Sequence, residues 1–78
     1  MTKKKILFDY SKLKGRIKEK GFTQEDVAKK CGFSAATLNY KLTNTSYFTA
    51  LQILNIAKTL EIAPEEIDKY FFAIQVKK

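Results

Sequence analysis

Residues 23–42 read TQEDVAKKCGFSAATLNYKL, and this stretch decides the fold. In each half, apolar residues recur every three or four positions, which places them on one side of an α-helix. Gly32 divides the halves, at a position where a chain that leaves a helix commonly takes the left-handed conformation. The stretch therefore predicts two helices, over 23–31 and 34–42, joined by a tight turn.

The same kind of helix start recurs outside this stretch. A bulky apolar residue precedes a capping residue at Asp9, Thr23, Ser34 and Thr49. Each of these side chains can accept a hydrogen bond from the free N–H groups of a first helical turn. Pro64 fits a first helical position, where its missing N–H has no cost. These starts predict helices over about 9–20, 23–31, 34–42, 49–60 and 64–70.

The two ends of the chain differ from its helical middle. Lys4–Phe8 and Phe71–Val76 are short and rich in Phe, Ile and Val, a composition that is typical of strands. A short terminal strand pair is therefore possible beside the five helices.

Length and residue types limit the chemistry. The 78 residues, 45% of them hydrophobic, suit one domain over 1–78. With one cysteine and no histidine, neither a disulfide nor a zinc site is expected, and no cofactor or small-molecule substrate is indicated. Cys31 falls on an apolar helix stripe, so we expect an inert thiol, no catalytic residue and no enzyme.

The longest apolar run is five residues, Tyr70–Ile74, far too short to span a membrane. Residues 1–5 resemble the basic start of a signal peptide, but polar and charged residues follow them instead of an apolar segment. We therefore expect a protein of the reducing cytoplasm.

The net charge of +7 is unevenly distributed. Residues 1–41 hold eleven Lys or Arg against four Asp or Glu, whereas residues 42–78 are balanced. This asymmetry favours a polyanionic partner, and a lysine-rich solvated surface is the alternative. Residues 1–5 are expected to form a flexible basic arm that either reaches DNA or only aids solubility.

The pattern Gln24-x-x-Val27-Ala28-x-x-x-Gly32-x-Ser34-x-x-x-Leu38 resembles the helix-turn-helix of the lambda and 434 repressor and Cro family. The flanking sequences look like those of short phage and prophage Cro-like regulators. The resemblance implies an all-α, five-helix, repressor-like DNA-binding domain with the helix-turn-helix as its second and third helices. It also implies a transcriptional repressor that binds a double-stranded operator through the major groove.

The resemblance assigns roles to the helix expected over 34–42 and its neighbours. Asn can bind adenine through paired hydrogen bonds, whereas Ala can only touch a thymine methyl group. The two alanines depart from the glutamine-rich pattern of the family. The expected base-reading residues are Ala35, Ala36, Thr37, Asn39 and Tyr40, and the expected phosphate-binding residues are Gln24, Ser34, Lys41 and Asn44.

Relatives in this family dimerise on paired half-sites, so the resemblance implies a homodimer. The apolar tail within 71–78 is a candidate for the dimer surface. The alternative is intrachain, with the tail packed beside Ile6 and Phe8 to close the core. The residues assigned to dimerisation are Tyr70, Phe71, Phe72, Ile74 and Val76.

A second functional hypothesis keeps the same scaffold but changes the partner. A protein-interaction module, similar to an antirepressor or antitoxin, would use the helix-turn-helix surface to contact protein. The alanines at the base-reading positions favour this alternative. DNA binding through phosphates falls steeply with salt, whereas an apolar protein interface changes little.

Overall fold

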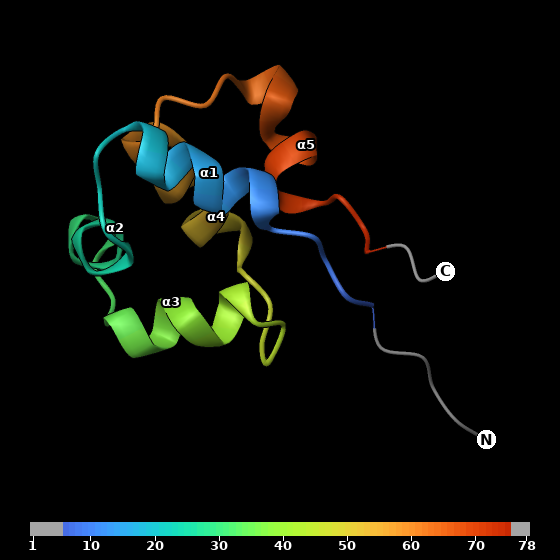
Figure 1. Cartoon of the computed structure of the whole chain (residues 1–78), viewed down its shortest axis with the longest axis horizontal. Helices are drawn as coiled ribbons and strands as arrows, with labels where there is room; N and C mark the ends of the chain where they lie inside the picture. Colours follow the sequence, from blue (N-terminus) through green and yellow to red (C-terminus); the bar gives the residue numbers. More distant parts are fainter. Residues whose placement is uncertain (1–5, 76–78) are drawn as a thin grey trace.

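The computed structural model describes residues 6–75, and within them it is built from helices (Figure 1). The expected all-α class is confirmed. The helix expected over 64–70 is a 3-10 turn that continues into a short α-helix. The elements are α1 (Ser11–Glu19), α2 (Gln24–Cys31), α3 (Ala35–Leu42), α4 (Ala50–Thr59), η1 (Pro64–Glu66) and α5 (Ile67–Phe71).

Side-chain caps set the starts of three helices, as the sequence predicts. Thr23 and Asp26 form a reciprocal capping box at α2, and Thr49 and Gln52 form another at α4. The Ser34 hydroxyl accepts a hydrogen bond from the first turn of α3. These contacts satisfy N–H groups that have no partner inside the helix.

The cap expected at Asp9 is wrong. Tyr10 occupies the N-cap of α1 without a side-chain hydrogen bond, and the Asp9 carboxylate accepts from the Ser11 N–H at 2.9 Å. The first helical hydrogen bond runs from the Lys14 N–H to the Tyr10 carbonyl at 2.8 Å, and the Asp9 N–H donates to the Ala73 carbonyl at 2.6 Å. The helix therefore begins one residue later than a cap at Asp9 requires.

Gly32 ends α2 in the left-handed conformation, with φ of +85°. The Phe33 N–H then donates to the Ala28 carbonyl at 3.0 Å, which closes the helix end and turns the chain sharply. In Figure 1, α2 is seen nearly end-on while α3 runs across the view, so the two helices cross steeply.

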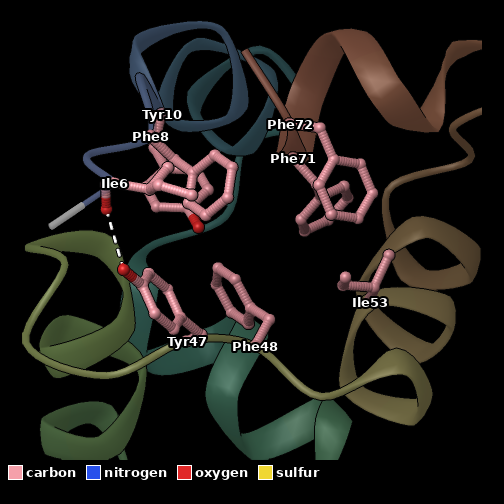
Figure 2. Close-up of a pocket in the computed structure, with 8 residues that line it drawn as sticks. All are labelled: Ile6, Phe8, Tyr10, Tyr47, Phe48, Ile53, Phe71 and Phe72. Carbon is pink, nitrogen blue, oxygen red and sulfur yellow. Dashed lines mark hydrogen bonds between the residues drawn. The ribbon is translucent and has the colours of Figure 1, made fainter. Parts of the chain in front are cut away.

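The two ends of the described part, near Phe8 and Ile74, lie side by side, but they form only an isolated antiparallel bridge between these two residues. The expected strand pair is therefore not formed within residues 6–75, because Phe71 still belongs to α5. The N-terminal segment also contacts the loop after α3, where the Tyr47 hydroxyl donates to the Ile6 carbonyl at 2.9 Å (Figure 2). Lys4, Lys5 and Val76 lie outside the described residues.

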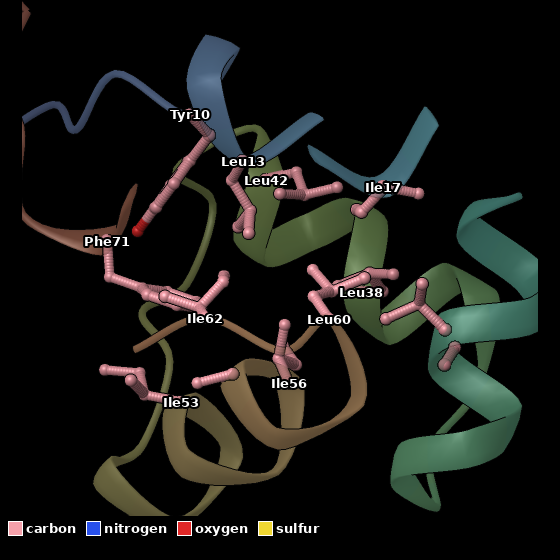
Figure 3. Packing of buried hydrophobic residues seen from close by; sticks show 13 residues of the cluster. Tyr10, Leu13, Ile17, Leu38, Leu42, Ile53, Ile56, Leu60, Ile62 and Phe71 are labelled. Atoms are coloured by element: carbon pink, nitrogen blue, oxygen red, sulfur yellow. The ribbon is translucent and has the colours of Figure 1, made fainter. Parts of the chain in front are cut away.

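The core gathers apolar side chains from every α-helix (Figure 3). One side each of α1, α3 and α4 is buried, and α2 contributes Val27 and Ala28. Among residues 6–75, no helix combines the length and the hydropathy needed to cross a lipid bilayer. The buried apolar residues are Tyr10, Leu13, Ile17, Val27, Ala28, Leu38, Leu42, Ile53, Ile56, Ala57, Leu60, Ile62 and Phe71.

Candidate interaction surface

The outward side of α3 carries short, neutral side chains. Ala36, Asn39 and Tyr40 are exposed, and Tyr40 keeps 55% of its surface open to solvent. Ala35 and Thr37 flank them and are half-buried. The structure therefore places all five expected base-reading residues on one face of one helix.

Lys41 does not lie on this face, so its expected contact with DNA phosphate is wrong. Its side chain is 8% exposed, and its ammonium group donates to the Tyr47 carbonyl at 2.9 Å. A cation held against a backbone carbonyl inside the loop cannot reach along a sugar-phosphate edge. Lys41 is the sole charged residue of α3, so the outward face of this helix has no charge of its own.

Asn44 is also misassigned as a phosphate contact. It is 4% exposed and has a positive φ of +66°, a conformation that Asn tolerates better than most residues. Its side-chain oxygen accepts from the Phe8 N–H at 2.9 Å, and its side-chain amide donates to the Phe8 carbonyl at 3.0 Å. Asn44 thus holds the N-terminal segment against the end of α3.

Gln24 and Ser34, the other expected phosphate contacts, are exposed at the starts of α2 and α3. The open groove of about 470 Å³ between these helix starts is partly acidic. Hydrogen bonds from the backbone and then the side chain of Thr23 lower the pKa of the Asp26 carboxyl, which therefore stays charged at neutral pH. The residues that line the groove are Glu25, Asp26, Lys29, Phe33, Ser34 and Ala35.

Most of the excess positive charge lies outside the described residues. Lys3, Lys4, Lys5, Lys77 and Lys78 account for five of the seven excess charges. Residues 6–75 carry ten basic and eight acidic side chains, a net charge of +2. This net charge is small compared with that of the whole chain, so residues 6–75 contribute little of the basic character that is typical of nucleic-acid-binding domains.

The residues assigned to dimerisation differ in how far they are exposed. Phe71 is 1% exposed and belongs to the core, so its role in a dimer surface is wrong and the intrachain alternative holds for it. Tyr70 is half-buried, with the Lys12 ammonium 5.7 Å from the centre of its ring. Phe72 and Ile74 are exposed, and Val76 lies outside the described residues.

The structure also reveals an apolar hollow of about 190 Å³ that the sequence did not predict. It lies between the N-terminal segment, the loop after α3, and α5 (Figure 2). One signal in the sequence was the pair of aromatic residues in the expected loop 43–48, where polar residues are the rule. The lining residues are Ile6, Phe8, Tyr10, Tyr47, Phe48, Ile53, Phe71 and Phe72.

Metal-binding side chains do not gather within the described part of the chain, where no group of three or more His, Cys, Asp or Glu could hold an ion. Cys31 is half-buried, and its sulfur lies 3.6 Å from the Thr59 hydroxyl. This placement is consistent with a structural thiol.

The chain is similar to a protein family and to a solved structure. Residues 6–74 match a family model described as "Protein of unknown function (DUF739)", and no curated protein matches the chain. The solution structure of the modulator of repression (MOR) of the temperate bacteriophage TP901-1 from Lactococcus lactis is similar, with a TM-score of 0.72 and 40% sequence identity. The match covers 83% of this chain and 88% of that one.

This similarity overturns the main functional expectation. The protein of similar fold and sequence is named a modulator of repression, whereas the sequence was interpreted as an operator-binding repressor. The prediction of a sequence-specific DNA-binding repressor is therefore wrong. The positions of Lys41 and Asn44 give a physical reason, because both side chains are used inside the fold.

Proposed function

We propose that this chain, which belongs to the DUF739 family, modulates repression by binding another protein. The similar structure of a phage modulator of repression supports a regulatory role of this kind. A direct way for such a chain to modulate repression is to bind the protein that reads the operator. The proposed partner is accordingly a DNA-binding repressor.

The outward face of α3 is the proposed contact surface. This assignment depends on the position of Lys41, whose side chain is buried and bonded to the loop after α3. The exposed face around Tyr40 is therefore neutral. Protein interfaces are depleted of charge at their centres and enriched in tyrosine, which often contributes much of the binding energy. In this proposal α2 and α3 keep a helix-turn-helix arrangement, and their exposed surface contacts protein.

Binding to purified repressors tests the proposal. DNA-binding repressors from the source genome are immobilised one at a time, and binding of the full chain is measured by interferometry. Tyr40→Ala should weaken binding to the true partner by about tenfold or more, because a central aromatic contributes upwards of 1.4 kcal/mol. Leu51→Ala is the matched control, since Leu51 is an exposed apolar residue of another helix, α4.

Two results would overturn the proposal. One is wild-type affinity for the Tyr40→Ala variant together with reduced affinity for the Leu51→Ala variant. The other is tight, sequence-selective binding of duplex DNA by the chain alone, with a steep loss as salt increases.

A further inference from the structure

Phe8 bonds to two parts of the chain that are far apart in the sequence. Its carbonyl oxygen accepts a hydrogen bond from the side-chain amide of Asn44 at 3.0 Å and another from the side-chain amide of Gln75 at 3.2 Å. Asn44 lies in the loop after α3 (residues 43–48), and Gln75 lies in the C-terminal segment that follows α5 (residues 72–75). A single backbone atom is therefore shared by the loop and the C-terminal segment.

The ring of Phe8 repeats this arrangement. It packs edge-to-face against the ring of Tyr47 in the loop, with centres 5.6 Å apart, and against the ring of Phe72 in the C-terminal segment, with centres 6.0 Å apart. Such ring pairs are stabilising beyond the area that they bury. Among residues 6–75, no hydrogen bond or aromatic pair joins the loop directly to the C-terminal segment.

The loop in turn holds the end of α3. The N–H groups of Thr45 and Ser46 donate to the Tyr40 carbonyl at 2.8 and 3.2 Å. The Lys41 ammonium donates to the Tyr47 carbonyl at 2.9 Å. The position of the loop is therefore tied to the backbone of Tyr40, whose side chain is exposed.

We propose that Phe8 is a junction that couples the C-terminal segment to the loop after α3, so that loosening one loosens the other. A residue that loses its bonds on one side is freer to move, which weakens the bonds on its other side. This coupling acts equally in both directions, as linkage requires. A partner that engages the C-terminal segment would in this way change the end of α3. The inference concerns the isolated chain and does not depend on the proposed function.

Hydrogen exchange followed by NMR on the full, isotope-labelled chain tests the coupling. The changes are made in the C-terminal segment, as Phe72→Ala and, separately, Gln75→Ala. The reporters are the amides of Thr45 and Ser46 in the loop. We expect each substitution to speed exchange at these amides by about fivefold, the effect of losing one hydrogen bond or ring contact from a local opening equilibrium.

Controls separate coupling from a general loss of stability. Leu51→Ala and Asn55→Ala change exposed residues of α4, and they should leave exchange at the loop amides unchanged. The amides of Val27 and Ile56, two buried residues, report on the whole fold. In the C-terminal variants they should be accelerated less than the loop amides.

The reverse experiment starts in the loop. Tyr47→Ala should speed exchange at the Gln75 N–H, which donates to the Leu7 carbonyl at 2.8 Å. Phe8→Leu removes the shared ring, so Phe72→Ala should affect the loop amides less in that background than in the wild-type chain. The amide spectrum of each variant shows that it is folded.

Three results would refute the coupling. Unchanged loop amides in both C-terminal variants would show that the two parts move independently. Equal acceleration at Val27 and Ile56 would show a loss of global stability instead. An effect of Phe72→Ala that is undiminished in the Phe8→Leu background would show that the effect bypasses Phe8.

Discussion

Asn44 performs two structural tasks with one side chain. Its amide group satisfies both the N–H and the carbonyl of Phe8, and its backbone adopts the left-handed conformation after α3. We expect Asn44→Ala to lower the free energy of unfolding by about 3 kcal/mol. The substitution leaves the Phe8 N–H unpaired, leaves the Phe8 carbonyl with only the Gln75 side chain as donor, and adds left-handed strain. Urea denaturation monitored by circular dichroism measures this change.

Asn44→Gly is the informative control, since glycine accepts the positive φ but cannot bind Phe8. It should be less destabilising than Asn44→Ala by about 1 kcal/mol. Equal losses for the two variants would show that the left-handed backbone contributes nothing, and wild-type stability for both would refute the structural role of Asn44.

Asp26 gives the fold a defined response to acid. Hydrogen bonds from the backbone and then the side chain of Thr23 lower its pKa below the ordinary value. Because the folded pKa is the lower one, the capping box contributes stability above the ordinary pKa and loses it as pH falls through the folded pKa. NMR titration of the side-chain carboxyl should show that Thr23→Val raises the pKa of Asp26.

Ser34→Ala provides the comparison for that titration, because it removes the cap of α3 instead. The pKa of Asp26 should not change in this variant. A pKa that moves equally in both variants would contradict the assignment of the shift to the capping box.

At the scale of elements, two glycines should respond oppositely to the same substitution. Gly15 lies inside α1, and an added Cβ would meet nothing within 4 Å. Gly15→Ala should therefore raise the free energy of unfolding by about 1 kcal/mol through helix propensity. Gly32→Ala should lower it by about 1–2 kcal/mol, because Gly32 has a φ of +85°.

Thermal unfolding of the two glycine variants provides the measurement. An increase in melting temperature for Gly32→Ala would contradict the left-handed turn between α2 and α3. A decrease for Gly15→Ala would show that α1 requires the glycine for a reason other than local space.

The elements were largely predictable because their signals are local. The caps at Thr23, Ser34 and Thr49 lie within three residues of the N–H groups that they bind, so the sequence pattern contains both partners. At Asp9 the local pattern missed the start by one residue, because the Tyr10 carbonyl accepts the first helical hydrogen bond. The bond between the backbones of Asp9 and Ala73 is a contact that no local pattern predicts.

The candidate site was predicted only in part, because some of its contacts join residues that are far apart in the sequence. The outward face of α3 follows from helical spacing, and its five residues are together on that face. The Asn44 side chain, in contrast, binds a residue 36 positions away, and the hollow combines segments from both ends of the chain. Such contacts depend on the packing of the whole molecule, which residue spacing does not contain.

Phe71 and Phe72 show how the tail belongs to the whole molecule. The rings of Tyr10, Phe48 and Phe71 form an edge-to-face series, with centres 5.5 Å apart at each step. Phe71 is fully buried, whereas Phe72 is half-exposed. Phe71→Ala should therefore lower the free energy of unfolding by about 3–5 kcal/mol, and Phe72→Ala should lower it by about 1 kcal/mol or less. Urea denaturation of both variants measures these losses of unfolding free energy. Similar small losses for the two variants would show that Phe71 does not belong to the cooperative core.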